Sequence, residues 1–176
     1  MGRAMDDVII AAASGTAFTG ETGATSTAAQ TAIAAGGAGL TIAKLRTAKQ
    51  TFDLASVDPS IPRHIVVGPE QITNLLSTTE VTSSDFNTVK ALVQGEIDSF
   101  LGFKFTVSNR LAKSGNDRTC IAFAQDGITL AIGKDVNARI DERADKSYAT
   151  QVYYCQSIGA TRMEEAKVLG IVCQEA

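Results

Sequence analysis

Apolar residues recur at helical spacing in four parts of the first hundred residues. The clearest is 41–55, where apolar side chains fall near the i, i+3, i+4 pattern and Lys44 lies among the mainly polar residues opposite them. The segment "SVDPSIP" ends this helix, because each proline disfavours helical geometry at the residue before it. Three shorter helices are predicted over 5–13, 69–77 and 86–97.

The remaining stretches have the apolar character or alternation that is typical of strands. "RHIVV" (63–67) is β-branched and bounded by prolines and a glycine, which predicts a short buried strand. Six further strands are predicted after residue 102: "FKFTVSN", "TCIAFA", "GITLAIG", "VNARIDERAD", "SYATQVYYCQSIGATR" and "AKVLGIVCQ". The first two are expected to pair across the turn "AKSGND". Helices come first and antiparallel-looking strands follow, so the predicted fold class is α+β.

The stretch "GEIDSFLGFKFTVSNRL" (95–111) leads from a predicted helix into the first of these strands. Phe103, Phe105 and Val107 alternate with polar residues, so all three are expected to face the core. Gly102 lacks a Cβ atom, which allows a tight turn from helix into strand. No acid, base or nucleophile is arranged around this stretch, so we interpret it as a structural corner.

Residues 24–39 are rich in Ala, Thr, Ser and Gly and follow no recognisable period. Such small side chains cannot build a packed core, so this segment is predicted to be an extended connection or loop. Mobility is expected over 20–39 for the same reason.

Composition and charge exclude several classes of protein. The 176 residues, 44% apolar and 20% charged, suit one globular domain, or one such domain with an irregular arm. A net charge of −3 gives no reason to expect tight, charge-driven binding of nucleic acid. No apolar run reaches the length of roughly 20 residues that a membrane span needs, and we see no signal peptide.

The candidate catalytic residues are few. Cys120, Cys155 and Cys173 form no Cys-x-x-Cys pair and are interpreted as reduced structural thiols, which indicates a reducing compartment. His64 is the single histidine, so the sequence offers no partner for a triad or a metal site. The glycine-rich segments lack the Lys-Ser/Thr of a phosphate-binding loop.

The segment "RIDERADK" has the highest charge density of the chain. Each acid has a basic neighbour within two residues, which argues against the shielded carboxylate pair of an acid–base mechanism. Two interpretations stay open, a solvated hairpin and a network of ion pairs between subunits. The candidate interface residues are Arg139, Asp141, Glu142, Arg143, Asp145 and Lys146.

The order of four segments resembles the major capsid protein of tailed bacteriophages, which has the Hong Kong 97-type fold. These segments are "DDVIIAAASGTAFTG", "RHIVVGPEQITNLLS", "GEIDSFLGFKFTVSNRL" and "DERADKSYATQVYYCQSIGATRM". The resemblance covers nearly the whole chain and is strongest over 63–111 and 128–172. It implies four parts: 1–39 is the end of a spine helix and a flexible connection, 40–132 an axial domain, 133–165 a segment of the peripheral domain, and 166–176 a strand returning to the axial domain.

The resemblance also implies a structural protein, rather than an enzyme, that self-assembles into an icosahedral shell. Its expected partners are other copies of itself, as pentamers and hexamers of the full-length protein, together with scaffold and portal proteins. The shell would enclose double-stranded DNA without sequence-specific binding. No cofactor, metal ion or membrane contact is expected. The expected location is the virion, after assembly in the cytoplasm of the bacterial host.

The chain departs from the family at its start. The N-terminal arm, the extended hairpin loop and the first part of the spine helix have no counterpart, so we expect a truncated or processed piece that assembles poorly alone. Two alternatives remain: an encapsulin-like nanocompartment shell with the same fold, and a small α+β enzyme that uses Cys155 or His64. A depressed thiol pKa and fast thiol labelling would favour the enzyme.

Overall fold

The computed structural model describes residues 2–27, 30–77 and 99–175, and the helix predicted over 86–97 lies outside them. Its helices are α1 (Gly2–Ser14), α2 (Ile42–Leu54) and α3 (Pro69–Ser77), with the 3-10 turns η2 (Ala144–Lys146) and η3 (Glu165–Lys167). Its strands are β1 (Ala17–Thr19), β2 (Thr25–Thr27), β3 (Gln30–Ile33), β4 (Arg63–Val67), β5 (Ser99–Phe100), β6 (Phe103–Val107), β7 (Lys113–Ser114), β8 (Asp117–Ala124), β9 (Ile128–Arg143), β10 (Ala149–Arg162) and β11 (Val168–Gln174).

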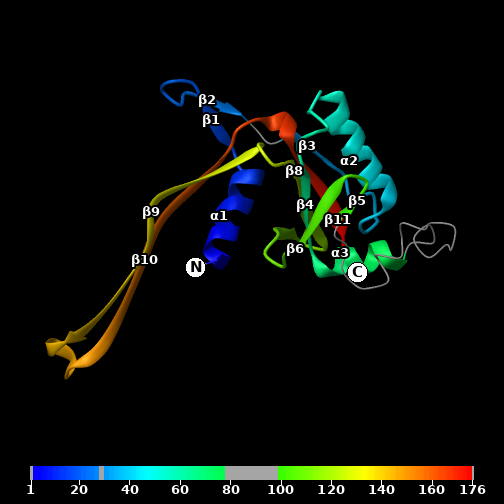
Figure 1. Cartoon of the computed structure of the whole chain (residues 1–176). Coiled ribbons are helices and arrows are strands. Elements are labelled where there is room, and N and C mark those ends of the chain that lie inside the picture. The colour runs from blue at the N-terminus through cyan, green and yellow to red at the C-terminus, as the bar shows by residue number, and fades with distance from the viewer. Residues whose placement is uncertain (1, 28–29, 78–98, 176) are drawn as a thin grey trace.

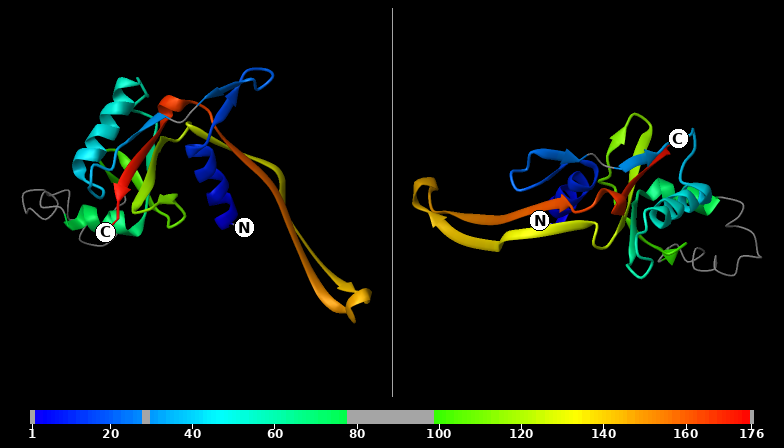
Figure 2. Two further views of the ribbon diagram at one scale, coloured as in Figure 1. Left: turned by 180° about the vertical axis from the view of Figure 1, so that it is seen from behind. Right: turned by 90° about the horizontal axis from the view of Figure 1, so that it is seen from above.

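A seven-stranded mixed sheet forms the body of the molecule. The strand order is β3-β11-β8-β4-β6-β5, and β7 pairs with β8. The β4–β6 and β3–β11 pairs are parallel, and the other pairs in this sheet are antiparallel. Figures 1 and 2 show α2 and α3 on one side of the sheet and α1 on the other. The mixture of helices and strands confirms the predicted α+β class.

The predicted pairing of β6 with β8 is wrong. β4 lies between these two strands, parallel to β6 and antiparallel to β8. The turn in "AKSGND" does form, but it joins β7 to β8, with Lys113 opposite Arg118. Strands covered on both faces read as continuous apolar runs, and the β-branched run of β4 fits this central place in the sheet.

The core lies between α2 and the sheet. Leu45, Ala48 and Phe52 on α2 are fully buried, as their helical spacing predicted, and the rings of Phe52 and Phe103 are 6.0 Å apart. Lys44 was predicted to lie on the polar side of this helix, and this prediction is wrong, because the side chain is buried.

The buried amine of Lys44 is held by backbone carbonyls. Its Nζ donates to the oxygens of Ala38 (2.7 Å), Gly39 (2.9 Å) and Val172 (3.0 Å). An ammonium group has three N–H donors, so all three are satisfied and the burial is tolerated. This contact ties α2 to β11.

The strand that begins at Phe103 corrects two predictions. Phe103 is fully buried and Phe105 half-buried, but Val107, the last residue of β6, is 58% exposed. Leu101 and Gly102 have φ values of 53° and 85°, which is typical of a two-residue hairpin turn. Gly102 therefore turns β5 into β6 and does not join a helix to a strand.

Part of the segment predicted as a loop, residues 24–39, forms strands. β2 pairs with β1, and β3 extends the main sheet alongside β11. Strand pairing uses backbone groups, so small side chains that cannot fill a core can still form a ladder. The mobility of 20–39 stays a prediction.

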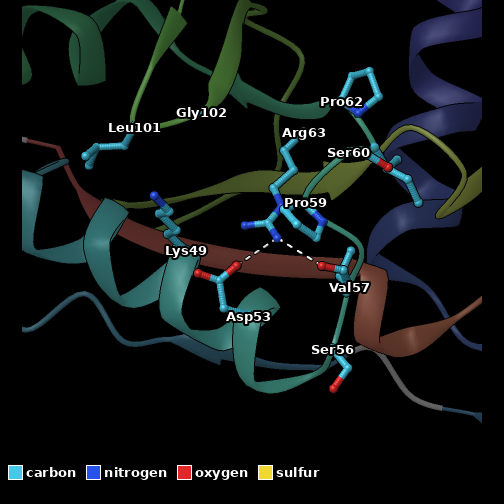
Figure 3. Close-up of a pocket in the computed structure, with 11 residues that line it drawn as sticks. Lys49, Asp53, Ser56, Val57, Pro59, Ser60, Pro62, Arg63, Leu101 and Gly102 are labelled. Carbon is cyan, nitrogen blue, oxygen red and sulfur yellow. Dashed lines mark hydrogen bonds and ion pairs between the residues drawn. The ribbon is translucent and has the colours of Figure 1, made fainter.

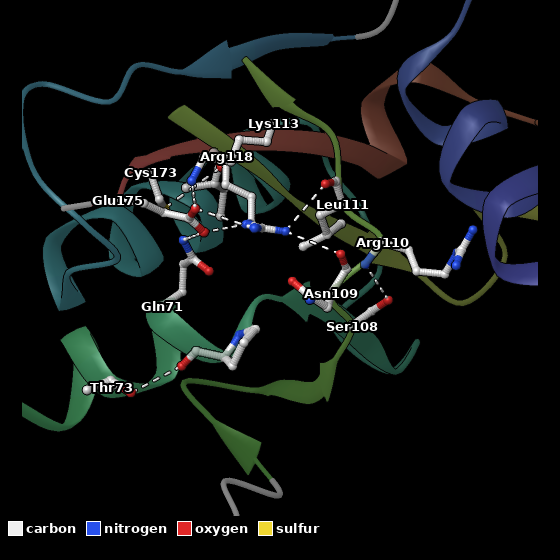
Figure 4. A network of polar contacts seen from close by, with 12 residues as sticks. Gln71, Thr73, Ser108, Asn109, Arg110, Leu111, Lys113, Arg118, Cys173 and Glu175 are labelled. Carbon is white, nitrogen blue, oxygen red and sulfur yellow. Dashed lines mark hydrogen bonds and ion pairs between the residues drawn. The ribbon is translucent and has the colours of Figure 1, made fainter. Parts of the chain in front are cut away.

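A buried carboxylate holds the C-terminal end of β11 against the sheet (Figure 4). Glu175 is 2% exposed and accepts hydrogen bonds from Arg118 and from Gln71 Nε2 at 3.1 Å, while Lys113 Nζ lies 2.5 Å from its Oε2. Hydrogen bonds from Arg118 and then Lys113 lower the pKa of Glu175 to about 2. The ionised side chain thereby links α3, β7, β8 and the end of β11.

Candidate assembly surface

The two strands predicted as "GITLAIG" and "VNARIDERAD" are one continuous strand, β9, which pairs only with β10 among the described residues. Together they form a long antiparallel hairpin that projects away from the sheet (Figures 1 and 2). We call residues 134–155, which include the tip η2, the distal hairpin. All of these residues are exposed except the half-buried Cys155.

The predicted interface residues all lie on the distal hairpin, but they do not share one face. Side chains alternate along a strand, so Arg139 and Asp141 face one side and Glu142 faces the other. Arg143, Asp145 and Lys146 surround the tip. The charge-dense segment is therefore a hairpin end, and its charges point in several directions.

One ion pair forms within the tip. Arg143 Nε and Nη2 donate to the two carboxylate oxygens of Asp145, at 2.9 and 2.6 Å. The other four candidates make no ion pair with any residue that the structure describes. They are Arg139, Asp141, Glu142 and Lys146. These four charges are consequently available for contacts outside the chain.

One face of the distal hairpin is polar. A depression of about 310 Å³ lies on it, lined by Lys134, Asn137, Arg139, Asp141, Gln151, Tyr153 and Cys155. This polar face combines both charge signs with amide and phenol groups, so it offers hydrogen-bond donors and acceptors side by side.

The opposite face is apolar, although it is exposed. Ile140 stands opposite Val152, and Ala138 opposite Tyr154, so these four residues share one side of the ladder. Ile140 is 71% exposed, Val152 68% and Tyr154 48%. We call these four residues the apolar face. Sequence reasoning noticed the alternation along β9 but missed this surface, which depends on the matching alternation along β10.

The same side of β10 is covered nearer the sheet. The β9–β10 ladder has two register shifts, one between Cys155 and Ser157 and one between Ser157 and Ile158. At both, the extra residue lies on β9, so side chains continue to alternate along β10 from Val152 to Arg162. Gln156 Nε2 contacts Met5 Sδ of α1 at 3.9 Å. The α1 helix therefore packs on the base of this side (Figure 2). The exposed fractions of Ile140, Val152 and Tyr154 show that it leaves the apolar face uncovered.

Arg162 fixes this arrangement at the base of the hairpin. Its side chain is buried, and Nη1 donates to the carbonyl oxygens of Ala13 (3.1 Å) and Gly15 (2.8 Å), while Nη2 donates to Thr27 O (3.0 Å). Ala13 O is one of the carbonyls that α1 leaves without a partner at its C-terminal end, and Gly15 O follows directly after the helix. One cation thus joins β10, the end of α1 and β2.

Comparison with known families identifies the protein class. The family model for phage capsid proteins matches residues 1–175. The chain belongs to this phage capsid family. Its fold is the Hong Kong 97-like fold that the segment order predicted, as the similarity to solved phage capsids shows.

Two solved structures illustrate the likeness. That of Mycobacterium phage Che8 is 20% identical, with a TM-score of 0.67 over 97% of this chain and 59% of that one. The capsid of Ralstonia phage GP4 is 11% identical, with a TM-score of 0.71 over 99% of this chain and 64% of that one. The capsid-family chain thus spans less than two thirds of these relatives. No curated protein matches it significantly.

The residues considered for catalysis lie apart in this capsid-family chain. His64 is half-buried on β4, stacks on Phe123 with ring centres 5.6 Å apart, and has its pKa lowered by burial and then by Lys104. Cys155 is half-buried on the polar face of the distal hairpin, instead of buried as predicted.

The other two thiols, Cys120 and Cys173, are free and buried on the neighbouring strands β8 and β11. A hydrogen bond with Cys173 and burial raise the pKa of Cys120. Within the described residues, no group of three or more His, Cys, Asp or Glu side chains could hold a metal ion. None of the helices described is long and apolar enough to cross a membrane.

Proposed function

We propose that the chain is the shell-forming part of a major capsid protein, which self-assembles into the icosahedral shell around a phage genome. The distal hairpin is the observation that carries this proposal. A two-stranded hairpin alone is marginally stable in water, and clustered exposed apolar side chains mark interaction surfaces. The apolar face therefore requires a partner, and a shell supplies identical copies in fixed positions.

The sheet and the hairpin correspond to the two domains of such a subunit. We assign 40–132 to an axial domain and 133–165 to a segment of the peripheral domain. Residues 166–176 return to the axial domain, which β11 supports by pairing with β8. Residues 1–39 are the end of the spine helix and the connection that follows, supported by the packing of α1 on β10.

The charged residues of the distal hairpin would set the register of contacts between copies. Arg139, Asp141, Glu142 and Lys146 supply two charges of each sign, so they can complement a second copy. Arg143 and Asp145 neutralise each other within the tip and contribute mainly shape. Exposed ion pairs are each worth only about 0–1 kcal/mol, so the apolar face would supply most of the affinity.

The finer partners follow from this role. Copies would form pentamers and hexamers in the full-length protein, with scaffold and portal proteins as further partners and assembly in the bacterial cytoplasm. The enclosed double-stranded DNA would meet the shell without sequence-specific binding, which agrees with a net charge of −3. A structural rather than catalytic role agrees with the family match.

The nanocompartment alternative shares the fold but is not favoured. The family model that matches residues 1–175 is one of phage capsid proteins, which supports a phage shell. For the enzyme alternative, thiol labelling of the folded chain remains the discriminating measurement. Fast labelling of Cys155 with a depressed pKa would support it.

Electron microscopy of the protein expressed from its full reading frame tests the proposal, with a matched pair of variants. Val152→Lys places a charge on the exposed apolar face, whereas Val107→Lys makes the same change at an exposed position of β6. We expect wild type and Val107→Lys to form closed shells and Val152→Lys to stay as free subunits with an unchanged melting temperature. A wild-type protein that stays strictly monomeric under all assembly conditions would refute the function.

A further inference from the structure

The sheet body carries a groove that lies apart from the distal hairpin. It runs between α2, the loop 56–62 and the turn at Leu101–Gly102, and encloses about 630 Å³ (Figure 3). A neighbouring depression of about 560 Å³ shares Lys49, Asp53 and Leu101 with it. The two depressions therefore form one continuous surface, which we call the α2 groove.

Arg63 forms the floor of the α2 groove. Its side chain is 7% exposed, and its guanidinium carbon lies 5.5 Å from the ring centre of Phe52. Nη2 donates to Asp53 Oδ1 at 2.8 Å and to the carbonyl oxygen of Val57 at 3.1 Å. Nε is buried and has no hydrogen-bond partner. Figure 3 shows both bonds leaving one nitrogen, while the other terminal nitrogen is turned toward the side of Lys49.

This arrangement leaves a buried cation with unused donors. A guanidinium group has five N–H donors and stays charged at all ordinary pH values. Nε is sealed from the groove, whereas the terminal nitrogen Nη1 makes no hydrogen bond with a described residue, so an acceptor that reached Nη1 would be bound favourably. Arg63 therefore marks the α2 groove as a site for an anionic group.

The rim of the groove restricts the chemistry of that group. Lys49 is exposed and makes no ion pair with any described residue. Together with Arg46, Arg63 and Asp53, it gives the α2 groove a net charge of +2. The walls include Val57, Pro59 and Leu101, so the groove suits a carboxylate that is carried on a short apolar segment.

We propose that the α2 groove receives an acidic side chain from a second copy of this chain. Each copy carries 19 acidic residues against 16 basic ones, so a neighbouring copy offers the complementary charge. The inference rests on the proposed function, because a shell supplies that neighbour. It adds a contact of the sheet body to the contacts of the hairpin.

Nuclear magnetic resonance of the ¹⁵N-labelled chain, from micromolar to millimolar concentration, tests this contact. We expect concentration-dependent shifts of the amides of Ser56, Ser60 and Gly102 in the wild type. Lys49→Glu should raise the midpoint of this self-association at least about tenfold, because a like charge then faces the incoming carboxylate. Lys104→Glu makes the same charge change on β6, outside the groove, and should leave the midpoint unchanged.

Groove amides that stay unmoved by concentration would overturn the inference, as would equal effects of the two variants. A titration with inorganic phosphate is the second arm. Shifts with phosphate but not with protein concentration would identify a free-anion site and also overturn it.

Shell formation separates this inference from the proposed function. If the protein forms shells but its groove amides do not shift with protein concentration, the inference is refuted and the proposed function stands. If the groove amides do shift but the full-length protein never forms shells, the proposed function is refuted and the contact between copies stands.

Discussion

The seven-stranded sheet and the distal hairpin are both built from long β-ladders, but they place their apolar residues differently. In the sheet, Ile65 and Phe103 are fully buried beneath helices. In the hairpin, Ile140 and Val152 pair across the strands and remain mostly exposed. The sheet can therefore stabilise the chain by itself, whereas the hairpin buries its apolar surface only against something else. We propose that this difference separates residues that fold the subunit from residues that assemble it.

The same substitution in the two regions should give the largest contrast. Ile65→Ala removes a fully buried side chain from β4 and is expected to lower the free energy of unfolding by about 2–5 kcal/mol. Ile140→Ala removes an exposed side chain from β9 and should change it by less than about 0.5 kcal/mol. Urea denaturation followed by circular dichroism measures both. Equal losses of stability would contradict the division between the regions.

Buried and exposed carboxylates provide a second contrast. Glu175→Gln leaves Arg118 and Lys113 without their anionic partner and should cost about 3 kcal/mol, in the range for a broken buried ion pair. Glu142→Gln, at an exposed position of the hairpin without an ion pair, should cost less than about 0.5 kcal/mol. Thermal denaturation of the two variants compares them, and a stable Glu175→Gln protein would show that the network is dispensable.

The pH dependence of stability should also distinguish Glu175 from Glu142, although the expected effect is smaller. The pKa of Glu175 is about 2 in the folded chain and 4.5 ordinarily, so its stabilising contribution is fully present above pH 4.5. That contribution is lost as the pH falls through the window from 4.5 to 2. Glu175→Gln should flatten the stability profile in this window, whereas Glu142→Gln should not. Parallel wild-type and Glu175→Gln profiles would contradict the assigned pKa.

Local patterns predicted the elements of the sheet region well. The spacing of Leu45, Ala48 and Phe52 specified α2, and the β-branched run at 63–67 specified β4. Strand order could not be predicted, because the insertion of β4 between β6 and β8 depends on pairing between distant segments. The burial of Lys44 was missed for the same reason, since one of its three carbonyl partners, Val172, is far along the sequence.

The charge density of the sequence located the distal hairpin, on which all six charged candidates lie. Their role as interface residues stays a prediction. The apolar face was not visible in either strand separately, because it exists only when Ile140 stands opposite Val152. The α2 groove was also missed, since Arg63 and Leu101 meet only in the folded sheet.

Hydrogen–deuterium exchange in assembled shells and in dissociated subunits tests the central claim most directly. Amides of β4 and β8 should exchange slowly in both states, because their ladders lie inside the core. Amides of residues 134–155 should exchange quickly in subunits and at least about tenfold more slowly in shells, where neighbouring copies cover the hairpin. Equal exchange of the distal hairpin in the two states would contradict its role as the assembly surface.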